Sequence, residues 1–185
     1  MVYELMQEEL EQTLKDCVAT CKSSSGVEGA KLRLAHYQLG RELVLRNVRL
    51  FDDSDIVVCF MRAALPFAMG IADAIDSTIL FFNNNEDRKF FEKNDAFIRG
   101  KDVILVDSVI NSGESMLSSY QKVKDSARSV KIMANVMCDK AKPKFLDKDV
   151  FVVRVSNNSF KGTKVKKQSG NVGPDTGDRL FKTLV

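Results

Sequence analysis

Residues 103–115 read VILVDSVINSGES. The first four residues form a continuous apolar run of strand length, which is typical of a strand covered on both faces of a sheet. A small polar segment starts at Asn111, and helical spacing begins at Ser115 and continues to Lys124. A strand, a polar loop and a helix in this order are parts of a βαβ unit, so the segment favours an α/β fold.

Further apolar runs of strand length lie on both sides of this segment, at 56–60, 78–82, 130–137 and 150–155. A helical pattern that opens at Pro66 and reaches Ile75 separates the first two runs. Because strands alternate with helices and hairpin signals are few, we expect a single α/β domain with a mainly parallel central sheet flanked by helices. Ligands of such sheets bind beyond the carboxyl ends of the strands.

The loop after the 103–106 strand has features that favour anion binding. The backbone N–H groups of Asn111–Ser115 converge at the start of a helix, whose dipole favours negative charge, and Ser112 and Ser115 add hydroxyl donors. Asp107, expected at the end of the strand, is suited to accept hydrogen bonds from two neighbouring sugar hydroxyls. An ordinary strand-to-helix turn, with Ser112 or Ser115 as N-cap, explains the spacing equally well.

Two helical patterns open the chain, so that in this interpretation two helices precede any strand. Apolar residues recur at helical spacing from Met6 to Cys21, and again from Leu32 to Leu43 after the break at Ser23–Gly26. We therefore divide the chain into an N-terminal helix and linker, residues 1–26, and one domain, residues 27–185.

Composition narrows the classes of partner. The chain has 185 residues, of which 44% are hydrophobic, and its 28 Lys and Arg nearly balance 25 Asp and Glu, for a net charge of +3. This balance does not indicate a polyanionic partner, so we expect no nucleic acid and a local site for any anion. The one strong basic run, Lys161–Lys167, is interpreted as a solvated loop.

We expect a cytoplasmic protein with free thiols and no membrane segment. The N-terminus is acidic and lacks the pattern of a signal peptide, and no apolar stretch approaches the roughly 18 residues of a membrane helix. Cys17 and Cys21 have helical spacing but no neighbouring His, which favours two helical cysteines over a zinc site. A structural or surface role is favoured for His36, the single histidine, over acid–base work.

Three segments together resemble the type I phosphoribosyltransferases, and most of all uracil phosphoribosyltransferase. VILVDSVINSGES resembles the family's strand with its acidic end and its loop for the 5-phosphate of phosphoribosyl pyrophosphate (PRPP). Residues 60–65, FMRAAL, resemble an Ile-Leu-Arg-Ala-Gly-Leu segment, and residues 174–183, PDTGDRLFKT, resemble a C-terminal Gly-Asp-Ala-Gly-Asp-Arg-Ile-Phe-Gly-Thr. The resemblance runs in order from about Leu32 to Thr183.

The resemblance implies that uracil N1 displaces pyrophosphate from carbon 1 of PRPP, giving uridine monophosphate, in an enzyme that forms dimers or larger assemblies and uses Mg²⁺. Asp107 and Asp175 would then be the catalytic carboxylates, the second reaching the metal through water. The PRPP-binding residues would be Arg62, Ala63, Asp107, Asn111, Ser112, Gly113, Glu114 and Ser115, and the base-binding residues Pro174, Asp175, Thr176, Gly177 and Asp178.

Several positions depart from the family pattern. Glu114 stands where the second glycine of the phosphate loop is expected, Ala64 and Pro174 also replace glycines, and an Asn after 78–82 replaces an Arg that contacts pyrophosphate. A solvated loop is favoured for this stretch, and Arg88 or Lys89 is the alternative source of a cation, with Arg88 assigned to PRPP. The departures leave a second hypothesis open, a non-catalytic or regulatory member that binds a nucleotide or phosphoribosyl compound. A scaffold protein that uses the apolar stripe of the first helix is a third.

Overall fold

A computed structural model describes the chain except residues 6, 53–54, 84–86, 158–174 and 184–185. Its described strands form one six-stranded sheet in the order β1-β6-β5-β4-β2-β3, and all neighbouring strands are parallel. The strands are β1 (Val2–Glu4), β2 (Ile56–Phe60), β3 (Thr78–Phe82), β4 (Asp102–Ile110), β5 (Ser129–Cys138) and β6 (Asp149–Ser156).

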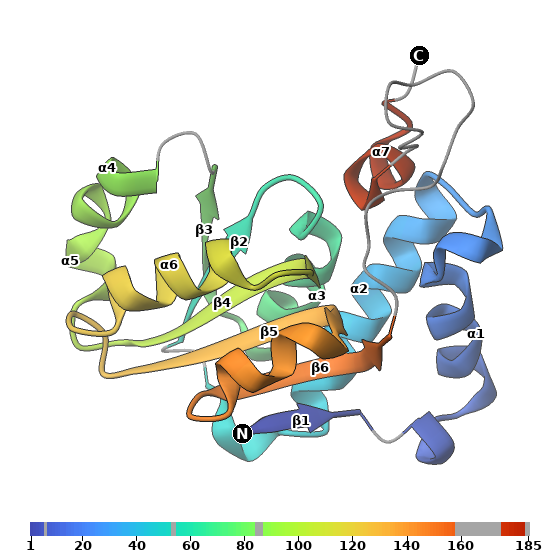
Figure 1. The fold of residues 1–185 in the computed structure, drawn as a ribbon, viewed down its shortest axis with the longest axis horizontal. Helices are drawn as coiled ribbons and strands as arrows, with labels where there is room; N and C mark the ends of the chain where they lie inside the picture. Colours follow the sequence, from blue (N-terminus) through green and yellow to red (C-terminus); the bar gives the residue numbers. More distant parts are fainter. Residues whose placement is uncertain (6, 53–54, 84–86, 158–174, 184–185) are drawn as a thin grey trace.

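Helices cover both faces of the sheet (Figure 1). The α-helices are α1 (Gln12–Cys21), α2 (Ala30–Leu45), α3 (Leu65–Ile75), α4 (Asp87–Lys93), α5 (Asp95–Ile98), α6 (Glu114–Val123) and α7 (Thr176–Phe181). The 3₁₀ turns are η1 (Gln7–Glu9), η2 (Ser23–Ser25), η3 (Val48–Leu50) and η5 (Asp139–Phe145). Helix α6 and turn η5 lie in front of the sheet in Figure 1, and α2 and α3 lie behind it. The α/β class expected from the sequence is confirmed.

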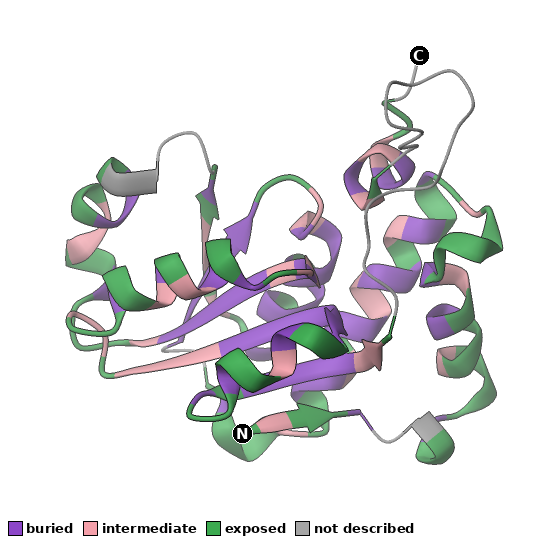
Figure 2. Ribbon diagram, viewed as in Figure 1, coloured by how far each residue is buried: buried purple, intermediate pink, exposed green. Residues whose placement is uncertain are grey.

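The core lies between the sheet and these helices (Figure 2). All five residues of β2 are buried, as are 103–106 of β4, because both faces of the central strands are covered. This explains why the strands read as unbroken apolar runs in the sequence. The predicted bounds of β3, 78–82, agree with the structure, and those of β5 and β6 agree to within a residue at each end.

The expectation that two helices precede any strand is wrong. Residues Val2–Glu4 form β1, which extends the sheet next to β6 with Val2 opposite Val150. A strand of three residues is too short to show a period in the sequence, and its pairing depends on a partner almost 150 positions away. The N-terminal segment therefore contributes to the central sheet, and α1 begins only at Gln12.

The strand predicted at 103–106 continues to Ile110, so Asp107 lies inside β4 rather than at its end. On one side β4 pairs with β2 only as far as Cys59 opposite Val106. On the other side it pairs with β5 as far as Ile110 opposite Met137, because β5 runs on to Cys138. Asp107 is thus the first residue of β4 beyond its pairing with β2.

No helix was expected in the C-terminal motif, but Thr176–Phe181 form helix α7. Lys161–Lys167 and Pro174 lie outside the described residues. All four cysteines are buried and free, as predicted. In the part of the chain that the structure describes, no helix has the length and apolar character needed to cross a membrane.

Candidate functional site

The candidate site lies where the order of the strands reverses. From β2 the chain moves to the edge strand β3, then returns to β4 on the other side of β2 and proceeds outward through β5 and β6. A crevice at the carboxyl ends of the strands forms at such a switch point. The segments that follow Phe60 in β2 and Val106 in β4 leave from adjacent strands at this edge, so the sheet brings two of the three predicted motifs together.

The loop between β4 and α6 encloses a cavity of about 120 Å³ lined by Asp107 and residues 109–116. Gly113, the N-cap residue of α6, has φ 80° and ψ −1°, a conformation that favours glycine. A Cβ atom at this position would lie 2.6 Å from Cε2 of the fully buried Phe145. The position therefore demands glycine for two reasons, its backbone angle and the ring packed against it.

The first turn of α6 is open to a ligand. Neither Ser112 nor Ser115 is the N-cap residue, and Gly113 has no side chain with which to cap the helix. Ser112 Oγ accepts the N–H of Glu114 at 3.4 Å, while the Ser112, Glu114 and Ser115 side chains are exposed and Asn111 is half-buried. N–H groups at a helix start bind anions, which is the chemistry that a phosphate site at this loop would use.

Asp107 borders the same cavity with a hydrogen-bonded carboxylate. Its Oδ1 accepts the N–H of Ser108 at 2.6 Å and that of Val109 at 3.4 Å. Burial nevertheless raises the pKa of Asp107 to about 6, since the two backbone donors offset only part of the lost hydration. The carboxylate is ionised at neutral pH and can accept hydrogen bonds from hydroxyl groups in the cavity.

His36 lies in a buried polar cluster beneath β4. Its ring nitrogens are 3.5 Å from Ser108 Oγ and 3.3 Å from Asn135 Nδ2. Burial, with a smaller effect of the nearby Arg179, lowers the pKa of His36 to about 3. The ring is therefore neutral and structural, in line with the favoured interpretation of the sequence, and it supports the residue that follows Asp107.

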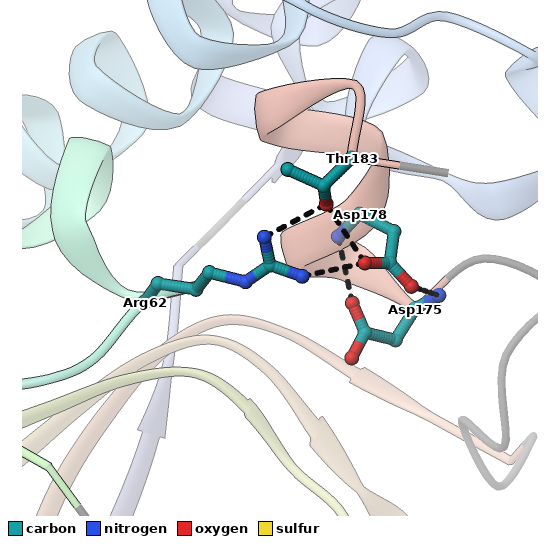
Figure 3. Close-up of polar contacts among 4 residues, drawn as sticks. All are labelled: Arg62, Asp175, Asp178 and Thr183. Atoms are coloured by element: carbon teal, nitrogen blue, oxygen red, sulfur yellow. Dashed lines mark hydrogen bonds and ion pairs between the residues drawn. The ribbon is translucent and has the colours of Figure 1, made fainter. Parts of the chain in front are cut away.

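Arg62 reaches across the site to the C-terminal helix (Figure 3). It follows β2, and the Met61–Arg62 peptide bond is cis. Nη2 of Arg62 lies 2.5 Å from Oδ1 of Asp178, and its Nη1 donates to Thr183 Oγ1 at 2.7 Å. Arg62, which the resemblance assigns to PRPP, thus contacts the segment that the resemblance assigns to the base. Ala63, next to Arg62, is half-buried against the core.

The carboxylates of α7 are held by a reciprocal cap. Asp175 Oδ1 accepts the N–H of Asp178 at 2.7 Å, and Asp178 Oδ2 accepts the N–H of Asp175 at 3.4 Å. Although burial acts to raise it, hydrogen bonds from Thr183, the Asp175 backbone and Arg62 hold the pKa of Asp178 below its ordinary value. Gly177 is buried beside them, and a Cβ atom there would lie 3.4 Å from Arg62 Nε, while Thr176 is half-buried.

Arg179 anchors α7 to the N-terminal part of the chain. It is buried, and its Nη2 donates to Val27 O at 2.9 Å and to Lys22 O and Ser25 Oγ at slightly greater distances. Arg33 adds a bond from Nη1 to Leu180 O at 2.7 Å. Residues far apart in the sequence therefore fix the third motif at the site. Arg88 lies in α4, but its side chain is outside the described residues, as is Pro174.

The sequence interpretation missed one basic side chain of the site. Lys144, in η5, donates from Nζ to Ser112 O at 2.9 Å and lies 4.0 Å from Glu114 Oε1. Its neighbour Phe145 is the ring packed on Gly113. No motif contains Lys144, since η5 follows the next strand along the chain.

The six-stranded parallel sheet with helices on both faces has the fold of the type I phosphoribosyltransferases. The family model for uracil phosphoribosyltransferase matches residues 39–183, and the chain belongs to that family.

Solved structures support the fold. A protein of Aquifex aeolicus is 18% identical with a TM-score of 0.68, and the match covers 100% of both chains. A hypoxanthine-guanine-xanthine phosphoribosyltransferase is also 18% identical, with a TM-score of 0.51 over 74% of this chain and 85% of that one. Among curated proteins, the transcriptional regulator GfcR of Methanococcoides burtonii is 24% identical over 110 residues, which are 56% of this chain. The chain matches only about half of that relative, 54% of its length.

Proposed function

We propose that the protein transfers phosphoribose from PRPP to uracil or a similar small base. In this reaction the base nitrogen forms a bond to carbon 1 of the ribose, the bond from carbon 1 to the pyrophosphate oxygen breaks, and pyrophosphate leaves with the electron pair. The N1 proton of uracil is released. Such a transfer needs three groups held in position and a site that stabilises separated charge.

The observation that carries the proposal is the joint placement of Asp107 and the loop 111–115 around one cavity, beside the segment that bears Arg62. The loop suits the 5-phosphate, and the carboxylate of Asp107 suits the ribose hydroxyls. Arg62 would contact the pyrophosphate, which is the leaving group. Residues 174–178 at the start of α7 would face the base, in keeping with the contact between Arg62 and Asp178.

We further propose that Mg²⁺ accompanies PRPP. Among the described residues no group of three or more His, Cys, Asp or Glu side chains could hold a metal. Magnesium, however, usually keeps several waters and binds one or two carboxylates together with substrate phosphates. Asp175, exposed at the start of α7, fits this pattern as a ligand through water. When bound, the ion would neutralise the departing pyrophosphate.

Turnover tests the proposal. The purified protein, mixed with Mg²⁺, PRPP and uracil, is expected to release pyrophosphate and form uridine monophosphate, and Asp107→Asn is expected to lower the rate by more than tenfold. Cytosine, orotate, hypoxanthine and guanine in parallel reactions would identify the base. Absence of turnover with every base, at concentrations where PRPP binds, would rule out the transferase.

A second candidate is a regulatory member of the family that binds a nucleotide or phosphoribosyl compound without turnover. Two observations favour it: Arg62 is engaged by a carboxylate, and a curated relative is described as a transcriptional regulator. Calorimetry separates the candidates. Binding of PRPP or uridine monophosphate without product formation supports the regulator, and binding with product formation supports the enzyme.

A further inference from the structure

Turn η5 packs against the loop 111–115 through the ring of Phe145. Phe145 is fully buried, and its ring occupies the space that a side chain at Gly113 would need, with Cε2 2.6 Å and Cζ 2.9 Å from the position of a Cβ atom. The packing of this buried ring against Gly113 places the backbone of η5 beside the loop. In Figure 1 the turn lies in front of the sheet together with α6, the helix that the loop begins.

The residue before Phe145, Lys144, places its ammonium group next to the loop. Lys144 Nζ donates at 2.9 Å to the carbonyl oxygen of Ser112, a residue that lines the cavity. An ammonium group has three donors. The bond to Ser112 uses one of them, and the Lys144 side chain is 44% exposed, which leaves room for a ligand to approach.

Among the residues that the structure describes, Glu114 is the acidic side chain paired with Lys144. Its Oε1 lies 4.0 Å from Nζ, beyond the distance of a hydrogen bond, and its side chain is 80% exposed. Such an exposed pair is weak, so Lys144 can exchange the carboxylate for a phosphate oxygen at little cost. Glu114, as the first residue of α6, is free to turn outward into solvent.

Building on the proposed function, we propose that Lys144 is the cation that binds the 5-phosphate, and that Glu114 limits this binding by competing for the same ammonium group. The ligand is a phosphomonoester dianion presented by a ribose. The arrangement accounts for the glutamate in the loop: the chain carries a negative charge where a phosphate must bind, and Lys144 offsets it from outside the motif. Lys144 contacts the ligand, and Phe145 positions it.

Binding of ribose 5-phosphate, measured by calorimetry, tests the inference without any turnover. Lys144→Gln is expected to weaken binding at least tenfold, Lys144→Arg to restore most of it, and Glu114→Gln to strengthen it severalfold. Lys140→Gln is the matched control, since Lys140 is an exposed lysine of the same turn, and it is expected to change the affinity less than twofold. Pyrophosphate serves as a second probe, because its proposed contact is Arg62. Lys144→Gln should therefore leave the affinity for pyrophosphate unchanged. A thermal melt of each variant shows that it is folded.

The outcomes separate this inference from the proposed function. Tenfold weaker binding of ribose 5-phosphate by Lys144→Gln, with no product from any base, supports the role of Lys144 and overturns the transferase. Product formation with equal ribose 5-phosphate affinity in wild type and Lys144→Gln overturns the role of Lys144 and leaves the transferase standing. The inference is wrong if the wild-type protein does not bind ribose 5-phosphate. It is also wrong if Lys140→Gln weakens ribose 5-phosphate binding as much as Lys144→Gln does.

Discussion

Arg62 and Asp178 lie 116 positions apart in the sequence and form an ion pair, with Nη2 and Oδ1 2.5 Å apart. The pair joins the segment after β2 to the C-terminal helix, and Thr183 bonds to both partners. A pyrophosphate at Arg62 would therefore meet a guanidinium group that already has an anionic partner. If Arg62 contacts the leaving group as proposed, this ion pair couples that contact to the position of α7.

This coupling predicts opposite effects of the two partners on pyrophosphate binding. Arg62→Gln is expected to weaken binding at least tenfold, because it removes the cation. Asp178→Asn is expected to strengthen it severalfold, because Arg62 loses a competing carboxylate. Stability should fall by no more than about 1 kcal/mol in either variant, since Arg62 is substantially exposed. Calorimetry with pyrophosphate and urea unfolding measure both effects.

Arg128→Gln is the control, because it removes an arginine from an exposed ion pair with Asp102 elsewhere on the molecule. It should leave pyrophosphate binding unchanged. If Asp178→Asn weakens binding as much as Arg62→Gln does, Asp178 supports the site and does not compete within it.

Because of Asp107, we expect the free energy of unfolding to decrease as the pH rises toward neutrality. Its pKa is raised in the folded state to about 6 from an ordinary 3.8, so the folded protein binds more protons than the unfolded chain between these values. Stability contributed by this group is present below pH 4 and is lost as the pH rises through 6. Asp107→Asn is therefore expected to stabilise the protein at pH 7.5 by about 2 kcal/mol relative to its effect at pH 4.

The measurement is urea unfolding of both proteins across this pH range, with the difference between them isolating Asp107. The same residue should make the wild-type transfer rate rise with pH through about 6, because the ionised carboxylate accepts the ribose hydroxyls. An equal stability difference at pH 4 and pH 7.5 would show that burial does not raise this pKa.

His36 should stay neutral throughout the physiological range. Its folded pKa is lowered to about 3, so its stabilising contribution is complete above pH 6.5 and is lost as the pH falls from 6.5 toward 3. Since the chain has one histidine, a carbon–proton NMR spectrum of the imidazole gives one set of signals. We expect no shift change between pH 8 and pH 5, whereas a midpoint near 6.5 would place the ring in solvent.

Replacing Gly113 by alanine is expected to destabilise the protein through a steric clash. The same substitution at a second glycine measures how much of the cost comes from the backbone conformation alone. Gly100 also has a positive φ, 71°, but nothing lies within 4 Å of an added Cβ atom. Gly100→Ala is therefore expected to cost about 1–2 kcal/mol for the backbone conformation alone. Gly113→Ala should cost about 1–3 kcal/mol more, because the methyl group meets the Phe145 ring.

A double-mutant cycle assigns the excess to that contact. Leucine lacks the Cε2 and Cζ atoms, so Gly113→Ala should cost less in a Phe145→Leu background than in the wild type, by urea unfolding. Equal costs of Gly113→Ala in both backgrounds, or equal costs at Gly100 and Gly113, would contradict the packing of η5 against Gly113.

The sequence predicts the central part of this fold well, because the signals there are local. The strands at 56–60 and 78–82 read as apolar runs bounded by polar residues, and the helix that opens near Pro66 follows from the proline at its first turn. What the sequence hides depends on partners far along the chain. β1 exists because Val2 pairs beside Val150, and β4 continues past Asp107 because β5 does.

For the site, too, the residues with local sequence signals could be predicted, and those placed by distant contacts could not. Asp107 and the loop 111–115 could be predicted as one candidate site because they lie close together in one stretch of sequence, Asp107 inside β4 and the loop after it. Lys144 could not, since only the packing of Phe145 on Gly113 brings it to the loop. Helix α7 had a usable signal, because two aspartates three positions apart, Asp175 and Asp178, can cap a helix start reciprocally. The resemblance assigns both residues to base binding.

The central claim is that the edge shared by β2 and β4 binds PRPP, and a crystal structure with Mg²⁺ and PRPP tests it most directly. We predict the 5-phosphate in the cavity formed by residues 111–115 beside Lys144, the ribose hydroxyls on Asp107, and the pyrophosphate within hydrogen-bond distance of Arg62. Glu114 should point away from the phosphate. Density for PRPP at another place on the molecule, with the 111–115 cavity empty at saturating ligand, would contradict the account.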